Sequence, residues 1–192
     1  MSERLPDGAR FAVLASGSGT NLQALLDAYP RELMVVAGNR EEAFALERAR
    51  LAGVPVEFVD PGDFETRKEF DAELAKRVAR HDVGLVVGAG YMRVLTPIFL
   101  ERFPAVINVH PSLLSDFKGL DAVKRALEAG VERTGMTVHL MVEEVDAGPM
   151  IRQEVVPVLP GDTEETLLER LHRVEHRLLV GAVADYFWGR VK

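Results

Sequence analysis

Short apolar runs alternate with amphipathic stretches along most of this 192-residue chain, and this alternation restricts the folds open to it. Arg10–Ala15, Leu33–Ala37 and Val83–Gly88 are rich in apolar residues, as expected for strands buried on both faces of a parallel sheet. Val54–Val59 and Val106–His110 are two further strand candidates. Strands that alternate with helices predict an α/β fold, with a doubly wound, mostly parallel twisted sheet of Rossmann-like type.

The segments between these runs carry helix signals. Helices are predicted from about Asn21 to Ala28, over Glu41–Ala52 with Gly53 as the stop, and from Thr66 to about His81. Thr66 and Glu69 have the spacing of a capping box, in which each side chain bonds the backbone N–H of the other residue.

The last third of the chain has a different rhythm. After a helix over Asp121–Ala129, the strand candidates Thr137–Val142 and Met150–Val158 are joined by a tight Asp-Ala-Gly-Pro turn, which predicts an antiparallel pair. A long C-terminal helix follows, capped by Asp162 or Thr163. With no internal repeat and no linker-like stretch, residues 1–192 are predicted to form a single domain.

Charge and composition exclude several classes of protein. The net charge of −7 argues against a nucleic-acid partner bound through its phosphates. The chain has no cysteine, its first residues lack a signal-peptide pattern, and no apolar run approaches the ~20 residues that span a bilayer. We therefore expect a cytoplasmic protein, a monomer or homodimer, whose partners are small molecules and not nucleic acid or membrane.

A Gly-rich loop, Ser16-Gly17-Ser18-Gly19-Thr20-Asn21, separates the first strand from the first helix. Its glycines permit a tight turn, and the free N–H groups of the helix start form a cradle for one phosphate. A plain strand-to-helix turn would select the same residues. Leu22 occupies the third glycine position of a dinucleotide fingerprint, and no Gly-Lys-Ser/Thr of a P-loop follows, so a phosphate monoester fits better than NAD or ATP.

Asn108 and His110 lie at the carboxyl end of a predicted strand, where ligands bind in doubly wound sheets. Two residues apart, they project from the same face. An amide donor beside an imidazole suits an acyl-transfer site with a developing oxyanion, although a loop-satisfying asparagine and a structural histidine are the plainer alternative.

Asp146 is an acid in the predicted turn between the last two strands. A carboxylate near His110 would hold the imidazole in its charged form, but Asp before Gly is also a common turn residue. His139 shares a strand face with Thr137 and Met141, and a role beside the same centre is open to it.

Several segments together resemble the glycinamide ribonucleotide formyltransferases of purine biosynthesis. The carrying residues run in the family's order over nearly the whole chain: Ala15–Gln23, Gly90–Pro97, Asn108–Leu114, Gly135–His139, Val145–Pro149 and Glu175-His176. The Asn-x-His-Pro-Ser motif with a later Asp-x-Gly-Pro marks the wider group that uses 10-formyltetrahydrofolate. The Gly-rich loop and Glu175-His176 narrow the resemblance to the ribonucleotide enzymes.

The resemblance implies a formyltransferase fold and a role for each group of residues. Asn108, His110 and Asp146 would be catalytic. The ribonucleotide would be bound by Gly19, Thr20, Asn21, His172, Arg173, Val174 and Glu175. The co-substrate 10-formyltetrahydrofolate would be bound by Arg67, Met92, Arg93, Val94, Leu95, Val142, Glu143, Glu144 and Val145. No metal is expected.

Three rivals remain beside this interpretation. A formyltetrahydrofolate hydrolase shares the Asn/His/Asp centre but normally carries an additional regulatory domain. A methionyl-tRNA formyltransferase would need an RNA-binding domain and a more basic surface. A non-catalytic module that binds a phosphorylated small molecule would explain the loop, but not Asn108, His110 and Asp146 together.

Overall fold

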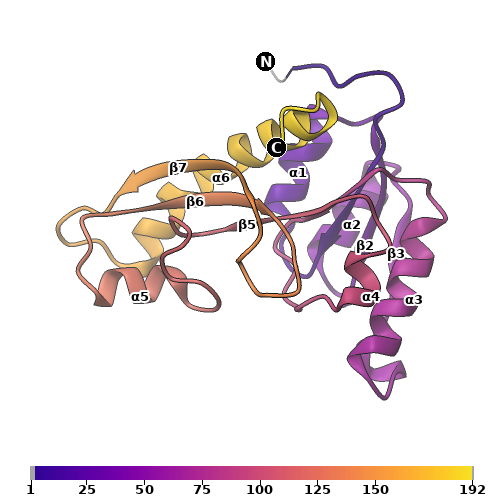
Figure 1. Ribbon diagram of the computed structural model, residues 1–192, viewed down its shortest axis with the longest axis horizontal. Coiled ribbons are helices and arrows are strands. Elements are labelled where there is room, and N and C mark those ends of the chain that lie inside the picture. Colours follow the sequence, from indigo (N-terminus) through magenta and orange to yellow (C-terminus); the bar gives the residue numbers. More distant parts are fainter. Residues whose placement is uncertain (1–2, 192) are drawn as a thin grey trace.

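A seven-stranded sheet with the order β3-β2-β1-β4-β5-β6-β7 organises the computed structural model, which describes residues 3–191 (Figure 1). The first five strands are parallel, whereas β6 is antiparallel to β5 and β7 is antiparallel to β6. The strands are β1 (Phe11–Ala15), β2 (Leu33–Gly38), β3 (Val56–Phe58), β4 (Leu85–Gly88), β5 (Val106–His110), β6 (Arg133–Leu140) and β7 (Met150–Pro157). The predicted fold class is confirmed.

Helices cover both faces of the parallel part of the sheet. They are α1 (Thr20–Ala28), α2 (Phe44–Leu51), α3 (Arg67–Ala79), α4 (Pro97–Leu100), α5 (Ala122–Glu128) and α6 (Glu164–Phe187), with a 3₁₀ turn at Pro61–Asp63. Phe11 and Val13 of β1 belong to a core cluster with α1, α2 and α6, whereas Ala12 and Leu14 pack with α3 and α4 on the other face. Because alternate residues of a strand point to opposite faces, both faces must be apolar, which explains the continuous apolar run.

Helix caps follow the sequence signals closely. Glu69 N–H donates to Thr66 Oγ1 at 3.2 Å and Thr66 N–H donates to Glu69 Oε2 at 3.1 Å, so the predicted capping box is present. Thr163 caps α6 in the same reciprocal way with Thr166. Gly53 has φ +71° immediately after the last turn of α2, a conformation that glycine adopts without a Cβ penalty.

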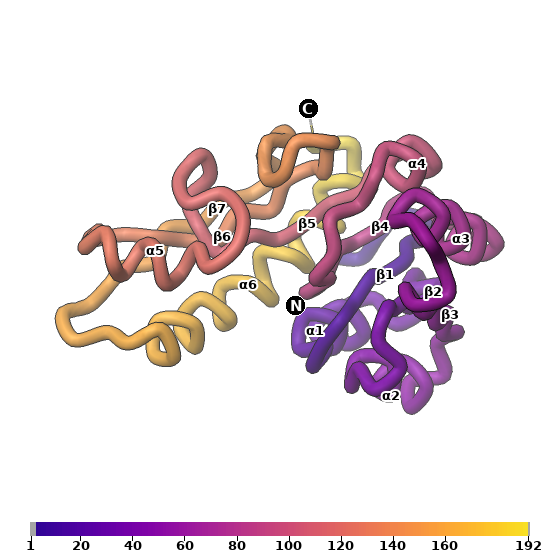
Figure 2. The backbone as a smooth tube through the Cα atoms, turned by 90° about the horizontal axis from the view of Figure 1, so that it is seen from below, coloured from indigo at the N-terminus to yellow at the C-terminus, as the bar shows by residue number. Residues whose placement is uncertain are grey.

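Several predicted boundaries, and one predicted turn, were wrong. Helix α2 begins at Phe44 rather than Glu41, and β6 begins at Arg133 rather than Thr137. Residues 141–149 form an extended loop between β6 and β7 rather than a tight turn. Figure 2 shows that the β6–β7 pair, α5 and the first half of α6 extend away from the part built on β1–β4.

Candidate active site

Asn108 and His110 lie at the carboxyl end of β5, as the sequence predicts. In the sheet register, Asn108 is opposite Gly88 of β4 on one side and His139 of β6 on the other. A Cβ at position 88 would lie 3.0 Å from Asn108 Oδ1, so the glycine leaves room for the amide. The polar side chains of Asn108, His110 and His139 therefore lie close together at the sheet edge.

Asp146 lies between two imidazoles. Its Oδ2 is 3.2 Å from His110 Nδ1, and its Oδ1 is 3.3 Å from His139 Nε2. The side chains of His110 and Asp146 are each 7% exposed and that of His139 is 2% exposed. The structure thus brings Asp146 to His110, and it adds His139 as a second neighbour of the same carboxylate.

The backbone also holds the Asp146 carboxylate in place. Asp146 has φ +53°, in the left-handed region that residues other than glycine rarely adopt, and Gly119 N–H donates to Oδ2 at 2.8 Å. Burial alone would raise the pKa of this carboxyl, but His139, the Gly119 N–H and the His110 charge outweigh it, so the pKa lies below its ordinary value. Asp146 is therefore held as a carboxylate.

In each imidazole, the ring nitrogen that does not face Asp146 lies close to a backbone carbonyl oxygen. His110 Nε2 is 2.9 Å from Phe117 O, and His139 Nδ1 is 2.8 Å from Leu140 O. A carbonyl oxygen only accepts hydrogen bonds, so these nitrogens must carry protons. The other ring nitrogen of each imidazole faces the Asp146 carboxylate, so each imidazole lies between a backbone carbonyl and a carboxylate oxygen.

A cavity of about 560 Å³ opens beside these side chains. Besides Asn108, His110, His139 and Asp146, its lining includes the predicted folate residues Met92, Arg93, Val94, Leu95, Val142 and Val145. Ligand cavities of this size with apolar walls and a few convergent polar groups are typical of small-molecule sites. Arg67, at the exposed start of α3, and Glu143 and Glu144 are not part of the lining.

The Gly-rich loop forms the start of α1, as predicted. Gly19 has φ +74°, and a Cβ there would lie 2.7 Å from Ala45 Cα, so the position requires glycine. Buried Ser16 donates from Oγ to Asn39 Oδ1 at 2.6 Å and accepts from Met92 N–H at 2.9 Å. Ser16 thereby ties this loop to the segment that lines the cavity.

Arg48 of α2 is a neighbour of the loop that the sequence did not indicate. Its Nε donates to Ser18 O at 2.9 Å, and its Nη1 donates to Gln23 Oε1 at 3.0 Å. Its guanidinium lies 4.7 Å from the Phe44 ring centroid. A cation next to the N-terminus of α1 adds positive charge where anions bind.

The α6 residues that are predicted to bind the ribonucleotide differ in their exposure to solvent. His172 and Arg173 are exposed, Glu175 is 12% exposed, and Val174 is packed into the core. Helix α6 packs against α1, which brings this turn of α6 to the same side of the sheet as the Gly-rich loop. Neither Gly19–Asn21 nor the 172–175 turn lines the cavity, so the residues predicted to bind the ribonucleotide lie outside the pocket that the predicted folate residues line.

Two further features of the described residues bear on the class of protein. Within residues 3–191, no group of three or more histidine or acidic side chains is arranged to hold a metal ion. Over the same span, no helix combines the length and the apolar character that crossing a membrane requires.

The fold and this centre define a transferase of the formyl-group class. Residues 9–183 match the formyl transferase family. The chain therefore belongs to the formyl transferase family.

Within this family, the relatives that match along most of both chains are phosphoribosylglycinamide formyltransferases. The enzyme of that name from Mycobacterium tuberculosis is 48% identical over 181 residues, which cover 92% of this chain and 84% of the relative. The glycinamide ribonucleotide transformylase 1 structure from Symbiobacterium toebii superposes with a TM-score of 0.93 and 45% identity, covering 98% of this chain and 93% of the other.

The chain also resembles one part of much longer proteins. It is 43% identical over 175 residues to the trifunctional purine biosynthetic protein adenosine-3 of Chironomus tentans. That match covers 87% of this chain but spans only 13% of the relative's length.

Proposed function

We propose that this chain transfers the formyl group of 10-formyltetrahydrofolate to the amine of glycinamide ribonucleotide, giving formylglycinamide ribonucleotide and tetrahydrofolate in purine biosynthesis. The observation that carries the proposal is the centre formed by the half-buried Asn108 with the buried side chains of His110 and Asp146, beside an apolar cavity. Two relatives that match over most of both chains carry the corresponding name.

The chemistry follows from the centre. The glycinamide amine attacks the formyl carbon, so a C–N bond forms and the carbonyl oxygen becomes negative. The Asn108 amide and the charged His110 stabilise that oxygen, and such donors act strongly where water is excluded. Asp146 keeps His110 charged and assists, through water, the transfer of a proton from the attacking nitrogen to the folate nitrogen as the old C–N bond breaks.

In this structure, His110 Nε2 is hydrogen-bonded to the Phe117 carbonyl oxygen at 2.9 Å. For His110 to donate to the oxyanion, this contact has to be exchanged for the substrate. The segment that carries Phe117 also supplies the Gly119 N–H to Asp146, so both partners of the centre depend on its position.

The proposed binding residues fall into two groups, one outside the cavity and one in or near its lining. Gly19, Thr20 and Asn21 bind the ribonucleotide phosphate through the start of α1, where the first turn carries no acid. His172, Arg173 and Glu175 bind the ribose and glycinamide, with Val174 contributing backbone only. Met92, Arg93, Val94 and Leu95 contact the pterin, Val142–Val145 close over it, and Arg67 meets the anionic tail of the folate.

The chain acts as one formyltransferase domain over residues 1–192, in the cytoplasm, on small molecules and without nucleic acid. With a net charge of −7 and two anionic substrates, attraction has to come from local groups such as the α1 N-terminus. Its reaction requires folate as a co-substrate and no metal.

Incubating the purified protein with glycinamide ribonucleotide and 10-formyltetrahydrofolate tests the function. Formation of tetrahydrofolate only when both substrates are present supports the transferase. Release of formate without the ribonucleotide would instead identify a hydrolase, and binding without turnover would identify a non-catalytic module.

A further inference from the structure

The loop over residues 115–121, between β5 and α5, contributes two backbone groups to the candidate active site. The Phe117 carbonyl accepts from His110 Nε2 at 2.9 Å, and Gly119 N–H donates to Asp146 Oδ2 at 2.8 Å. In formyl transfer, His110 has to leave this carbonyl in order to donate to the oxyanion of the substrate. The fate of the Phe117 carbonyl during that exchange therefore affects the rate.

The conformation of the 115–121 loop needs support from outside the loop. Phe117, Gly119 and Asp121 have φ values of +49°, +80° and +56°, all in the left-handed region. Glycine adopts this region freely, but in phenylalanine and aspartate the Cβ crowds the backbone, which costs free energy. Contacts made by other elements must therefore hold these residues in place.

Arg125 of α5 makes such contacts with two successive carbonyls of the loop. Its Nη2 donates to Phe117 O at 2.9 Å and to Lys118 O at 2.5 Å. The centre of its guanidinium lies 5.9 Å from the centroid of the Phe117 ring. Phe117 O thus accepts from His110 on one side and from Arg125 on the other. Within residues 3–191, these are the two donors to that oxygen.

Helix α5 holds Arg125 firmly behind the loop. Ala122, Val123 and Ala126 of this helix expose only 3%, 4% and 0% of their surface. The cavity is lined by residues 119–122, whereas Arg125 is partly buried and is not part of the lining. Arg125 therefore acts on the centre only through the loop.

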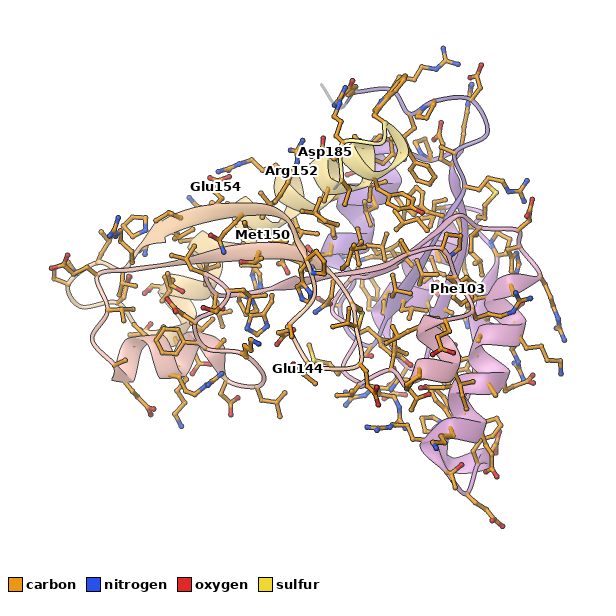
Figure 3. All side chains as sticks on the ribbon, in the orientation of Figure 1. Phe103, Glu144, Met150, Arg152, Glu154 and Asp185 are labelled. Carbon is orange, nitrogen blue, oxygen red and sulfur yellow. The ribbon has the colours of Figure 1, made fainter. Side chains whose placement is uncertain are left out.

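A second ion pair crosses the loop but does not reach the Phe117 carbonyl. Lys118 Nζ lies 3.2 Å from Glu144 Oε1, and Glu144 belongs to the loop between β6 and β7 (Figure 3). These side chains are 38% and 76% exposed, and ion pairs so open to water contribute little. The contact that holds the carbonyl independently of His110 is that of Arg125.

We propose that Arg125 is a positioning residue for formyl transfer, which keeps the Phe117 carbonyl hydrogen-bonded while His110 moves to the oxyanion. The proposal rests on the function proposed above. A carbonyl oxygen has two lone pairs and can accept from both donors at once. Removing the last donor of a partly buried carbonyl is unfavourable, whereas removing one of two leaves it satisfied. Arg125 thereby makes the exchange easier and keeps Gly119 N–H on Asp146.

Arg125→Met tests the proposal, because it removes the donors but keeps a long aliphatic side chain. We expect kcat to fall by about tenfold, since the exchange would leave the Phe117 carbonyl without a donor. The KM values of both substrates should stay within about twofold of wild type, because Arg125 does not line the cavity. Arg125→Lys should recover most of kcat, because an ammonium group also donates to a carbonyl.

Lys124→Met is the matched control. Lys124 is the neighbouring cation on α5, it is exposed, and its Nζ lies 3.9 Å from Glu128 Oε1. Its removal changes the net charge by the same amount, and kcat should remain that of the wild type. A folded Arg125→Met protein with wild-type kcat overturns the role of Arg125. A wild type that does not turn over contradicts the proposed function instead.

A double variant separates positioning from general support of the fold. If Arg125 acts through His110, adding Arg125→Met to His110→Ala should change the remaining rate by less than about twofold. A merely structural role would lower that rate by the same factor as in the wild type. Equal losses in both backgrounds therefore contradict the proposal.

Amide hydrogen exchange, followed by NMR, gives a readout that does not depend on turnover. Exchange of the Gly119 N–H should be faster in Arg125→Met, because the loop loses its hold, and unchanged in Lys124→Met. Exchange in β1 should be the same in both variants, which shows that the fold is intact. Gly119 exchange that is unchanged in Arg125→Met would mean that Arg125 does not hold the loop.

Discussion

Asn108 is the residue of the centre that contributes a donor without any charge, so its truncation isolates oxyanion stabilisation. For Asn108→Ala we expect turnover to fall by roughly 10²–10³-fold, the scale for the loss of one such donor. The KM values should change less than kcat, because the developing charge exists only in the transition state. Steady-state kinetics measures this, with circular dichroism as the control for folding. Near-normal kcat in a folded variant would remove Asn108 from the mechanism.

Asp146 should link the centre to acid stability. Its pKa in the folded protein lies below the ordinary value of 3.8, so the carboxylate stabilises the fold above that pH and loses this contribution as the pH falls through the folded pKa. Asp146→Asn lacks the contribution throughout. The difference in the free energy of unfolding between the two proteins should therefore shrink as the pH is lowered below 3.8.

Urea unfolding at a series of pH values measures that difference, and the carboxylates common to both proteins cancel. A difference that stays constant with pH would mean that the Asp146 charge does not interact with its two imidazoles. At neutral pH, the same variant should have lost most of its formyl transfer while remaining folded.

At the scale of single residues, the sequence predicts those residue positions that the geometry of a strand determines. Asn108 and His110 follow from their spacing on a strand and from the position of that strand in a doubly wound sheet. Asp146 could be linked to them only through resemblance, because a long loop carries it back to the sheet edge. The contacts of Phe117 and Gly119 with the centre carry no signal in the sequence, since they are made by backbone atoms.

At the scale of elements, Asp71 of α3 holds in place the segment that follows β4. It is fully buried, and its Oδ2 accepts from Thr96 N–H at 2.6 Å. Burial, and then the Asp71 charge, raise the pKa of Tyr91 in the same segment. Residues 92–95 of this segment line the cavity.

We expect Asp71→Ala to weaken folate binding, with the KM for 10-formyltetrahydrofolate rising about tenfold, equivalent to ~1.4 kcal/mol. The KM for the ribonucleotide should stay near its wild-type value, because the proposed binding residues for that substrate lie on α1 and α6. Asp71→Asn keeps an acceptor for Thr96 N–H and should recover much of the loss. Equal increases in both KM values would indicate general loosening of the fold instead.

The elements themselves were predicted better than their ends. β5 was predicted with its observed bounds because apolar residues and Pro111 delimit it. Only the start of α3 was predicted closely, because its capping box is local; the helix ends at Ala79 rather than near His81. β6 begins earlier than predicted, since Gly135 is a poor strand former in isolation and residues 133–136 become strand through their pairing with β7. The sequence predicts a tight turn where residues 141–149 form a longer loop, because Asp, Gly and Pro are common in tight turns and in loops alike.

At the scale of the whole molecule, α6 joins the part built on β1 and α1 to the part built on β6, β7 and α5. It packs on α1 next to the Gly-rich loop, and also on α5, β6 and β7. Its buried face includes Leu167, Leu171 and Leu179, each with no exposed surface. The 24-residue length of α6 lets one element fix the distance between the two regions that we propose to bind the substrates.

Leu171→Ala should therefore destabilise the molecule as a unit, by about 2–5 kcal/mol, the usual cost of a leucine-sized cavity. Glu169→Ala is the matched control, because it is exposed on the same turn and should change the free energy of unfolding by less than about 0.5 kcal/mol. Denaturant unfolding followed by far-UV circular dichroism and by the fluorescence of the single tryptophan measures both. Coincident transitions are expected, since α6 belongs to the same core as β1 and α1. If the transitions measured by the two probes separate in Leu171→Ala, the region built on β6 and β7 unfolds apart from the parallel sheet. In that case α6 does not couple the two proposed substrate-binding regions.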